Sequence, residues 1–218
     1  MHQKQFEIVV LRPTAVFLSF LASQLPEQDI PSLKLLHTDN TAYVIEKQTS
    51  EEATVDEIEK HFTTMFRHEI SRWLGPDARN EIENNFLDFL CCFKFEIHSH
   101  IILMEPSLKE GRQVLAIKPR SVLLNWMKNT VEEQEELVNI LEKVTLSQLA
   151  ENATVLVKNF PTLNAIKPFL NDYYQPIFET AMSRMSQDVD QWPEIKSFQE
   201  FSKYFSIEIH TQLIYLHH

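Results

Sequence analysis

The sequence predicts an α+β protein in which an antiparallel or mixed sheet packs with helices. Two segments, 95–103 and 207–215, alternate apolar and polar residues with the period of two that is typical of half-buried strands. The segment 55–73 instead repeats apolar residues every three or four positions, as an amphipathic helix does. The 218 residues include only two glycines, Gly75 and Gly111, which excludes glycine-rich phosphate loops and nucleophile elbows and favours a helix-rich scaffold.

A strand and a helix are expected at the start of the chain. The β-branched run 6–11 predicts the strand, and Pro13 suits the first turn of the helix because its ring fixes φ and it has no N–H to donate. Two apolar runs, 33–36 and 43–45, then flank a turn-forming Asp-Asn pair. This arrangement predicts a β-hairpin.

Two further helices are expected before the first period-two strand. Thr54 and Glu57 form a capping-box pattern, which predicts that a helix begins there, and Gly75-Pro76 ends it. Asp77 can cap the next helix, whose apolar stripe is Ile82, Phe86, Phe89 and Phe93.

The sequence predicts mainly helix for the second half of the chain. A partner strand is expected over 113–118, followed by a helical stretch from 121 to about 185 that contains a capping box at Thr145-Leu146-Ser147-Gln148. A short helix over 194–204 then leads into the last strand. The expected fold is therefore a sheet with a helix-rich insertion between residues 121 and 204 and a C-terminal strand that returns to the sheet.

One domain, residues 1–218, is the expected organisation. A strand near the C-terminus needs a sheet to join, and the other expected strands all lie before residue 120. The alternative is an α/β lobe over 1–120 and a helical lobe over 121–204, with 205–218 as a strand returning to the first lobe. We expect no internal repeat and no low-complexity tract.

The charge and the cysteine content indicate which classes of partner and which cellular compartment to expect. A formal net charge of -11 repels a phosphate backbone, so no nucleic-acid partner is expected. No apolar run is long enough for a membrane span, so no membrane insertion is expected either. The adjacent Cys91 and Cys92 do not suit a normal disulfide and predict reduced thiols in a cytoplasmic protein. No cofactor is expected.

Histidines are the main candidates for chemistry. His98 and His100 lie two apart on one expected strand, and His210 lies near Glu208 on the last one. If these strands were neighbours, the side chains could converge as zinc ligands in a metal-dependent enzyme, which is the alternative function. Polar residues on the solvated face of a sheet give the same pattern. We favour that interpretation and assign no catalytic or metal-binding residue.

An aromatic and methionine stripe is the main candidate for binding. Tyr174, Phe178, Met182 and Met185 share one face of an expected helix. Such a stripe can be core, but adaptable protein-binding grooves also use these side chains. We therefore predict a non-enzymatic adaptor or chaperone that binds apolar segments of partner proteins, with a translocated effector as a further alternative.

The opening Phe6-Glu7-Ile8-Val9-Val10-Leu11-Arg12-Pro13 and the acidic, Phe-rich composition resemble the LvgA-type virulence adaptors of the Legionella Dot/Icm type IV secretion system (type IVB). The resemblance implies a subunit of the secretion coupling complex. It also implies that the chain works with IcmS and IcmW on the C-terminal tail of the ATPase DotL and presents effectors for export. It transfers no binding residue to this chain.

Overall fold

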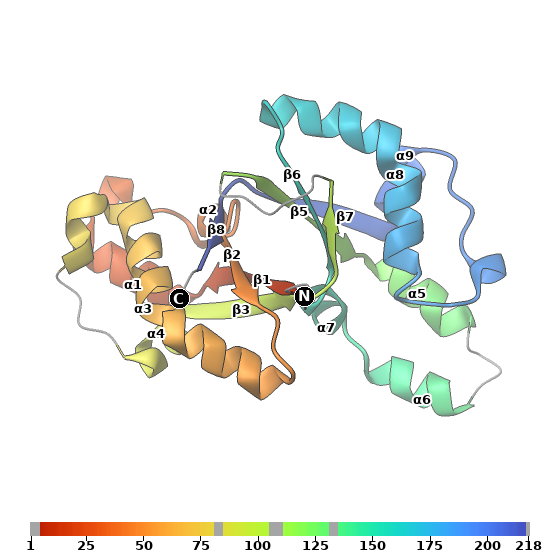
Figure 1. Ribbon diagram of the computed structural model, residues 1–218, viewed down its shortest axis with the longest axis horizontal. Coiled ribbons are helices and arrows are strands. Elements are labelled where there is room, and N and C mark those ends of the chain that lie inside the picture. The colour runs from red at the N-terminus through yellow and green to blue at the C-terminus, as the bar shows by residue number, and fades with distance from the viewer. Residues whose placement is uncertain (1–4, 81–84, 105–110, 131–134, 217–218) are drawn as a thin grey trace. The chain divides into compact units, whose positions relative to one another are not determined.

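The protein has an α+β fold made of two compact units (Figure 1). The computed structural model describes residues 5–80, 85–104, 111–130 and 135–216. Unit 1 is Met1–Ser99, Lys109–Gly111 and His210–His218, and unit 2 is His100–Leu108 and Arg112–Ile209. The chain therefore changes unit near residues 100 and 210.

Unit 1 contains a four-stranded mixed sheet in the order β3-β1-β2-β8. β1 is antiparallel to both β2 and β3, whereas β2 and β8 are parallel. The C-terminal strand does return to the sheet of the N-terminal region, as β8. The main elements are β1 (Phe6–Pro13), α1 (Ala15–Gln24), α2 (Leu33–Leu36), β2 (Ala42–Glu46), α3 (Glu51–Leu74), α4 (Phe86–Cys92), β3 (Phe93–His98) and β8 (Leu213–Tyr215).

Unit 2 contains a second four-stranded mixed sheet in the order β4-β6-β5-β7. β5 and β6 are antiparallel, whereas β4 and β6 are parallel. The main elements are β4 (Ile101–Leu103), β5 (Gln113–Pro119), α5 (Ser121–Thr130), α6 (Glu135–Lys143), α7 (Leu146–Glu151), β6 (Thr154–Lys158), α8 (Ile166–Met182), α9 (Phe198–Tyr204) and β7 (Phe205–His210). Short 3-10 turns connect several of these elements.

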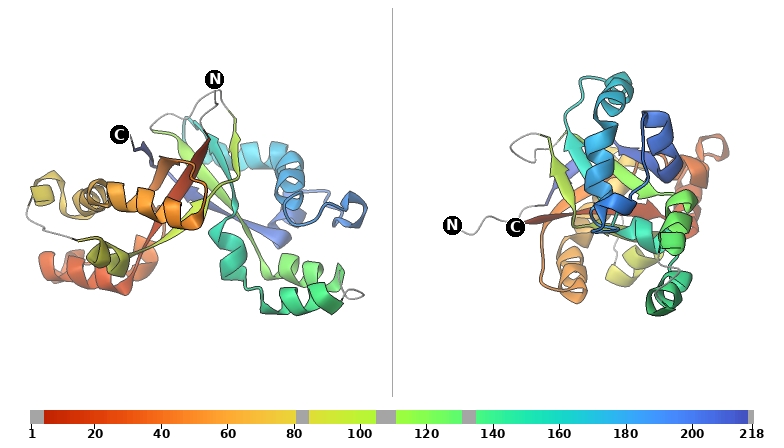
Figure 2. Two further views of the ribbon diagram at one scale, coloured as in Figure 1. Left: turned by 60° about the horizontal axis from the view of Figure 1, so that its bottom comes forward. Right: turned by 90° about the vertical axis from the view of Figure 1, so that its right-hand side faces the viewer.

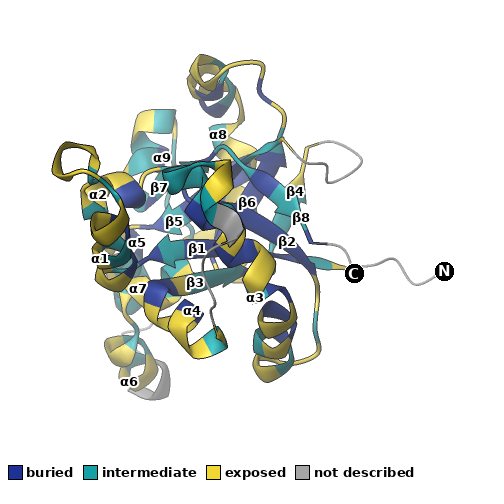
Figure 3. Cartoon of the chain, turned by 90° about the vertical axis from the view of Figure 1, so that its left-hand side faces the viewer, coloured by how far each residue is buried: buried dark blue, intermediate teal, exposed yellow. Residues whose placement is uncertain are grey.

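Each unit has its own core of buried apolar side chains, rich in aromatic rings. In each unit helices lie beside the sheet (Figure 2). In unit 1 the Phe93 ring lies 4.6 Å from Phe17 and 5.3 Å from Phe89, measured between ring centroids. In unit 2 the Phe205 ring lies 5.5 Å from Phe201 and 5.9 Å from Phe178. The central strands are buried along most of their length, while the helices keep exposed outer faces (Figure 3).

Several expected elements differ from the observed ones. The run 33–36 is helix α2, not a hairpin strand, because the Ser32 hydroxyl accepts from the Leu35 N–H and caps a helical turn. Helix α3 begins before the expected capping box, with Ser50 as its N-cap. Thr54 is instead buried within the helix and donates its hydroxyl hydrogen to the Glu7 carboxylate at 3.2 Å. The capping box at Thr145 and Gln148 is confirmed.

The stretch 121–204 is not wholly helical, because it contains β6. Residues 154–157 are all buried, so this strand has no polar face and shows no alternation that would reveal it. The last strand region also differs, because it forms two strands in two sheets. β7 joins the sheet of unit 2, and β8 joins the sheet of unit 1.

Candidate functional site

An apolar groove in unit 2 is the candidate functional site. It has a volume of about 630 Å³ and lies between α5, α6 and the segment that follows α8. This volume falls within the range of about 300–1,000 Å³ that is usual for ligand pockets. Its apolar lining is Trp126, Met127, Ile140, Leu141 and Met185.

The groove also has polar lining residues. They are Thr130, Ser186, Gln187 and Gln191, together with Asp188, the one charged residue among its described lining residues. The Trp192 indole N–H donates to the Ser186 carbonyl at 3.2 Å, and the Asp188 N–H donates to the Ser186 hydroxyl at 3.2 Å. These bonds hold the segment after α8 that lines the groove, and the lining as a whole combines apolar and polar residues.

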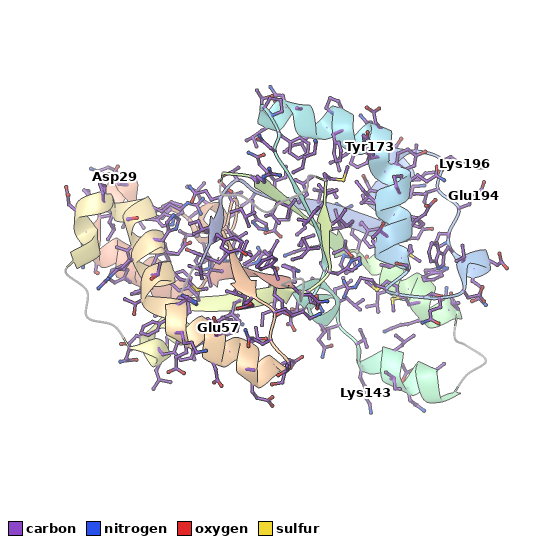
Figure 4. The ribbon with its side chains drawn as sticks, viewed as in Figure 1. Asp29, Glu57, Lys143, Tyr173, Glu194 and Lys196 are labelled. Carbon is purple, nitrogen blue, oxygen red and sulfur yellow. The ribbon has the colours of Figure 1, made fainter. Side chains whose placement is uncertain are left out.

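Helix α6 also lines the groove and packs against α5. The Ile140 side chain is 59% exposed although it belongs to the apolar face of the helix. A second, smaller cavity of about 230 Å³ lies between the same two helices, and Leu141 lines both cavities. Lys143 marks the C-terminal end of α6 (Figure 4). Ile140 is therefore an apolar side chain of α6 that the rest of unit 2 leaves incompletely covered.

The stripe predicted to bind partners lies mostly in the core of unit 2. Phe178 and Met182 are 3% and 0% exposed, because α8 turns them toward the sheet and α9. Tyr174 and Met185 are partly buried and pack against the same core. Of the four, Phe178 and Met182 offer almost no surface to a partner. Met185 is the one that reaches the groove.

Two of the three histidine candidates are buried, and His100 is half-buried. His98 and His210 are both 0% exposed, and Nε2 of His98 lies 3.6 Å from the Glu96 carboxylate. Glu208 instead pairs with Lys118 at 2.8 Å. Across the described parts of the chain, no group of three His, Cys, Asp or Glu side chains is placed to hold a metal ion.

His100 has a specific polar environment in unit 2. Its Nδ1 lies 3.0 Å from the Thr154 hydroxyl, next to strand β6. Burial, and then the positive charge of Arg184, lower the pKa of His100 below its ordinary value of 6.5. The folded protein therefore favours the neutral imidazole, and the unfolded chain takes up a proton more readily.

We expect this difference to make the stability of the protein fall at acid pH. The contribution of His100 is present above the ordinary histidine pKa and is lost as the pH falls below it. Substituting His100→Gln removes the titration but keeps a polar side chain. Urea denaturation at pH 5 and pH 8 should show a smaller stability difference in the variant than in the parent protein. An unchanged difference would contradict the assigned environment.

A buried polar cluster in unit 1 is a second site of interest. The Tyr43 hydroxyl donates to Oε1 of Glu69 at 3.0 Å, and it lies 3.1 Å from Nδ1 of His68. Burial, followed by the charge of Glu69, raises the pKa of Tyr43 well above its ordinary value, so the phenol stays protonated and acts as a donor. Arg72 extends the cluster with an ion pair to Asp39 at 3.3 Å. The cluster thus gives the buried Glu69 carboxylate a hydrogen-bond donor.

Sequence reasoning missed the groove residues Trp126, Ile140 and Leu141. For Ile140 and Leu141 the signal was present as an amphipathic face in the segment 135–143. What the sequence could not show is that this face lies over α5 and leaves space beside it.

Comparisons with known proteins identify no relative. No family model, no curated protein sequence and no solved structure matches the chain. In the residues that the structure describes, no helix is both long and apolar enough to cross a membrane.

Proposed function

We propose that the chain is a non-enzymatic adaptor that binds an apolar segment of a partner protein in the groove of unit 2. The groove is the observation that carries the proposal. Its walls combine Trp126 with Met127 and Met185, and aromatic and methionine side chains can repack around different apolar partners. A short amphipathic helix, with an apolar face for the groove, is the type of segment that suits this lining.

Charge supports the same proposal. The chain carries a net charge of -11, and Asp188 is one of the residues that line the groove. Basic residues beside the apolar face of a partner segment would therefore be attracted to this protein, and the attraction would weaken as salt increases.

A charged residue in the wall of the groove should weaken binding. Because Ile140 is 59% exposed, Ile140→Glu should leave the fold intact while placing a carboxylate against the apolar face of the ligand. We expect affinity for a short amphipathic leucine–lysine peptide to fall by roughly tenfold or more, equivalent to about 1.4 kcal/mol. Isothermal titration calorimetry measures the change.

Leu163→Glu is the matched control, because Leu163 is 55% exposed in unit 2, does not line the groove and receives the same added charge. A peptide with glutamine in place of leucine controls for charge attraction alone. Equal losses in the two variants, or equal binding of the two peptides, would overturn the groove as the binding site.

The resemblance to Dot/Icm adaptors extends the proposal to a specific cytoplasmic assembly. IcmS, IcmW and the C-terminal tail of DotL are the partners to test first, by co-purification with the parent protein and with the Ile140→Glu variant. Association that Ile140→Glu removes would support both the secretion role and the groove. If the leucine–lysine peptide binds but none of these partners does, the proposed secretion role is wrong, and the proposal that the groove binds an apolar segment still stands.

A further inference from the structure

The two units share one arrangement of strands and helices, although the sequence predicted no internal repeat. In unit 1 the order is β1, α1, β2, α3, α4, β3, and in unit 2 it is β5, α5, β6, α8, α9, β7, with additional helices inserted before β2 and β6. The sheet orders β3-β1-β2-β8 and β7-β5-β6-β4 then correspond strand by strand. In each sheet the fourth strand is parallel to its neighbour.

The correspondence extends to individual backbone hydrogen bonds. The Ala42 N–H donates to the Gln212 carbonyl at 3.0 Å, and the Val155 N–H donates to the His100 carbonyl at 3.0 Å. At the other end of the fourth strands, Leu216 donates to Val44 at 3.1 Å. The matching bond in unit 2, from Met104 to Val157, is 3.2 Å long.

Side chains repeat in the same places. Arg12 pairs with Glu96 at 2.9 Å in unit 1, and Lys118 pairs with Glu208 at 2.8 Å in unit 2. The segments 86–104 and 198–216 align without a gap, and identical residues occupy the paired positions Phe86 and Phe198, Phe89 and Phe201, Phe93 and Phe205, Glu96 and Glu208, Ile97 and Ile209, His98 and His210, and Ile102 and Ile214.

The chain path differs from a simple tandem repeat at one point. β4 follows β3 in the sequence but lies in the sheet of unit 2, and β8 follows β7 but lies in the sheet of unit 1. The short connections after His98 and His210 therefore carry each fourth strand into the other sheet. Exchange of an identical element between two copies of a fold is the geometry of domain swapping.

We propose that the protein is an internal duplication of one βα unit whose two copies exchange their fourth strands. The edge of β2 is then a binding site for the segment around β8, and the edge of β6 is the equivalent site for the segment around β4. The partner that each edge accepts is a short parallel strand of the type Ile/Leu-Ile-Leu/Tyr from a second copy of the same unit. Neither half of the chain contains all four strands of its own sheet.

Cutting the full chain between the two halves tests this proposal. A specific protease site inserted after residue 107 would separate β4 from β5 without removing any strand. We expect the two fragments to co-elute as one complex in native buffer and to separate in denaturant, because each fragment supplies a strand to the other's sheet. Separation of folded fragments in native buffer would overturn the exchange.

Matched substitutions identify the strands as the cause. The double substitution Met104→Pro and Leu216→Pro removes the two equivalent N–H donors. The dissociation constant of the two fragments should then be about tenfold higher, or more, than that of the fragments of the parent protein. Met104→Ala with Leu216→Ala keeps both N–H groups, so it should retain most of the association. Equal association of the proline and alanine pairs would contradict the proposal.

Hydrogen exchange in the uncut chain provides an independent measurement. Leu216→Pro alone should accelerate exchange of the Ala42 amide and leave the Val155 amide protected, and Met104→Pro alone should do the reverse. Loss of protection at both amides in either variant, or at neither, would show that the strands are not exchanged in this way.

Discussion

Substituting Phe93→Ala or Phe205→Ala is expected to lower the free energy of unfolding by about 3–5 kcal/mol. Each side chain is 1% exposed and lies at the start of a strand, where it packs against the aromatic residues of the helices. Removing either ring leaves a cavity, because the neighbouring rings are held by their own helices and can close it only in part. Since the two residues occupy equivalent places, the two losses should be similar.

Chemical denaturation followed by circular dichroism measures both losses. Leu87→Ala is the control, because Leu87 is 72% exposed on α4 and should change stability by no more than about 0.5 kcal/mol. If either phenylalanine variant behaved like Leu87→Ala, the aromatic core assigned to that unit would be wrong.

Substituting Tyr43→Phe is expected to cost about 1.5–3 kcal/mol. The change removes one hydroxyl group, and with it the hydrogen bond that Glu69 accepts at 3.0 Å. Glu69 is 2% exposed, so water cannot replace the lost donor. A buried carboxylate that loses a donor is destabilised by more than the strength of an average hydrogen bond.

A double-mutant cycle separates this effect from loss of packing. Glu69→Met removes the carboxylate and keeps a side chain of similar length, so the double variant of Tyr43→Phe and Glu69→Met should lose less stability than the sum of the single variants. Thermal and urea denaturation of the four proteins measure the coupling. Additive losses would mean that Tyr43 and Glu69 do not interact in the folded protein.

Local signals in the sequence predicted much of the fold. The β-branched run at the start of β1, the capping box before α7 and the long amphipathic pattern of α3 each depend on neighbouring residues alone. They were therefore visible without knowledge of tertiary contacts. The α+β class followed from them.

The elements that were not predicted fall into two groups, one with a local cause and one that depends on distant contacts. The run 33–36 has a local cause: it is apolar enough for a strand, but the Ser32 cap before it starts a helical turn. β6 is buried on both faces and so lacks alternation. The exchange of β4 and β8 is a pairing between distant segments, which the pattern within each segment does not encode.

The candidate site was predicted by residue type but not by position. Aromatic and methionine side chains do line a groove, yet most of the predicted stripe fills the core because α8 packs that face on the sheet. Met185 belongs to both the stripe and the groove lining. The other walls come from α5 and α6, whose relative placement depends on tertiary packing.

Methyl NMR of protein labelled at its methionine methyl groups tests the groove most directly. Met127 and Met185 line the groove, whereas Met65 lies in the core of unit 1 and Met104 is 37% exposed elsewhere in unit 2. On titration with the leucine–lysine peptide, we expect the Met127 and Met185 signals to shift together and the Met65 and Met104 signals to stay in place. Shifts confined to Met65 or Met104, or no shift at Met127 and Met185 at saturating peptide, would contradict binding in the groove.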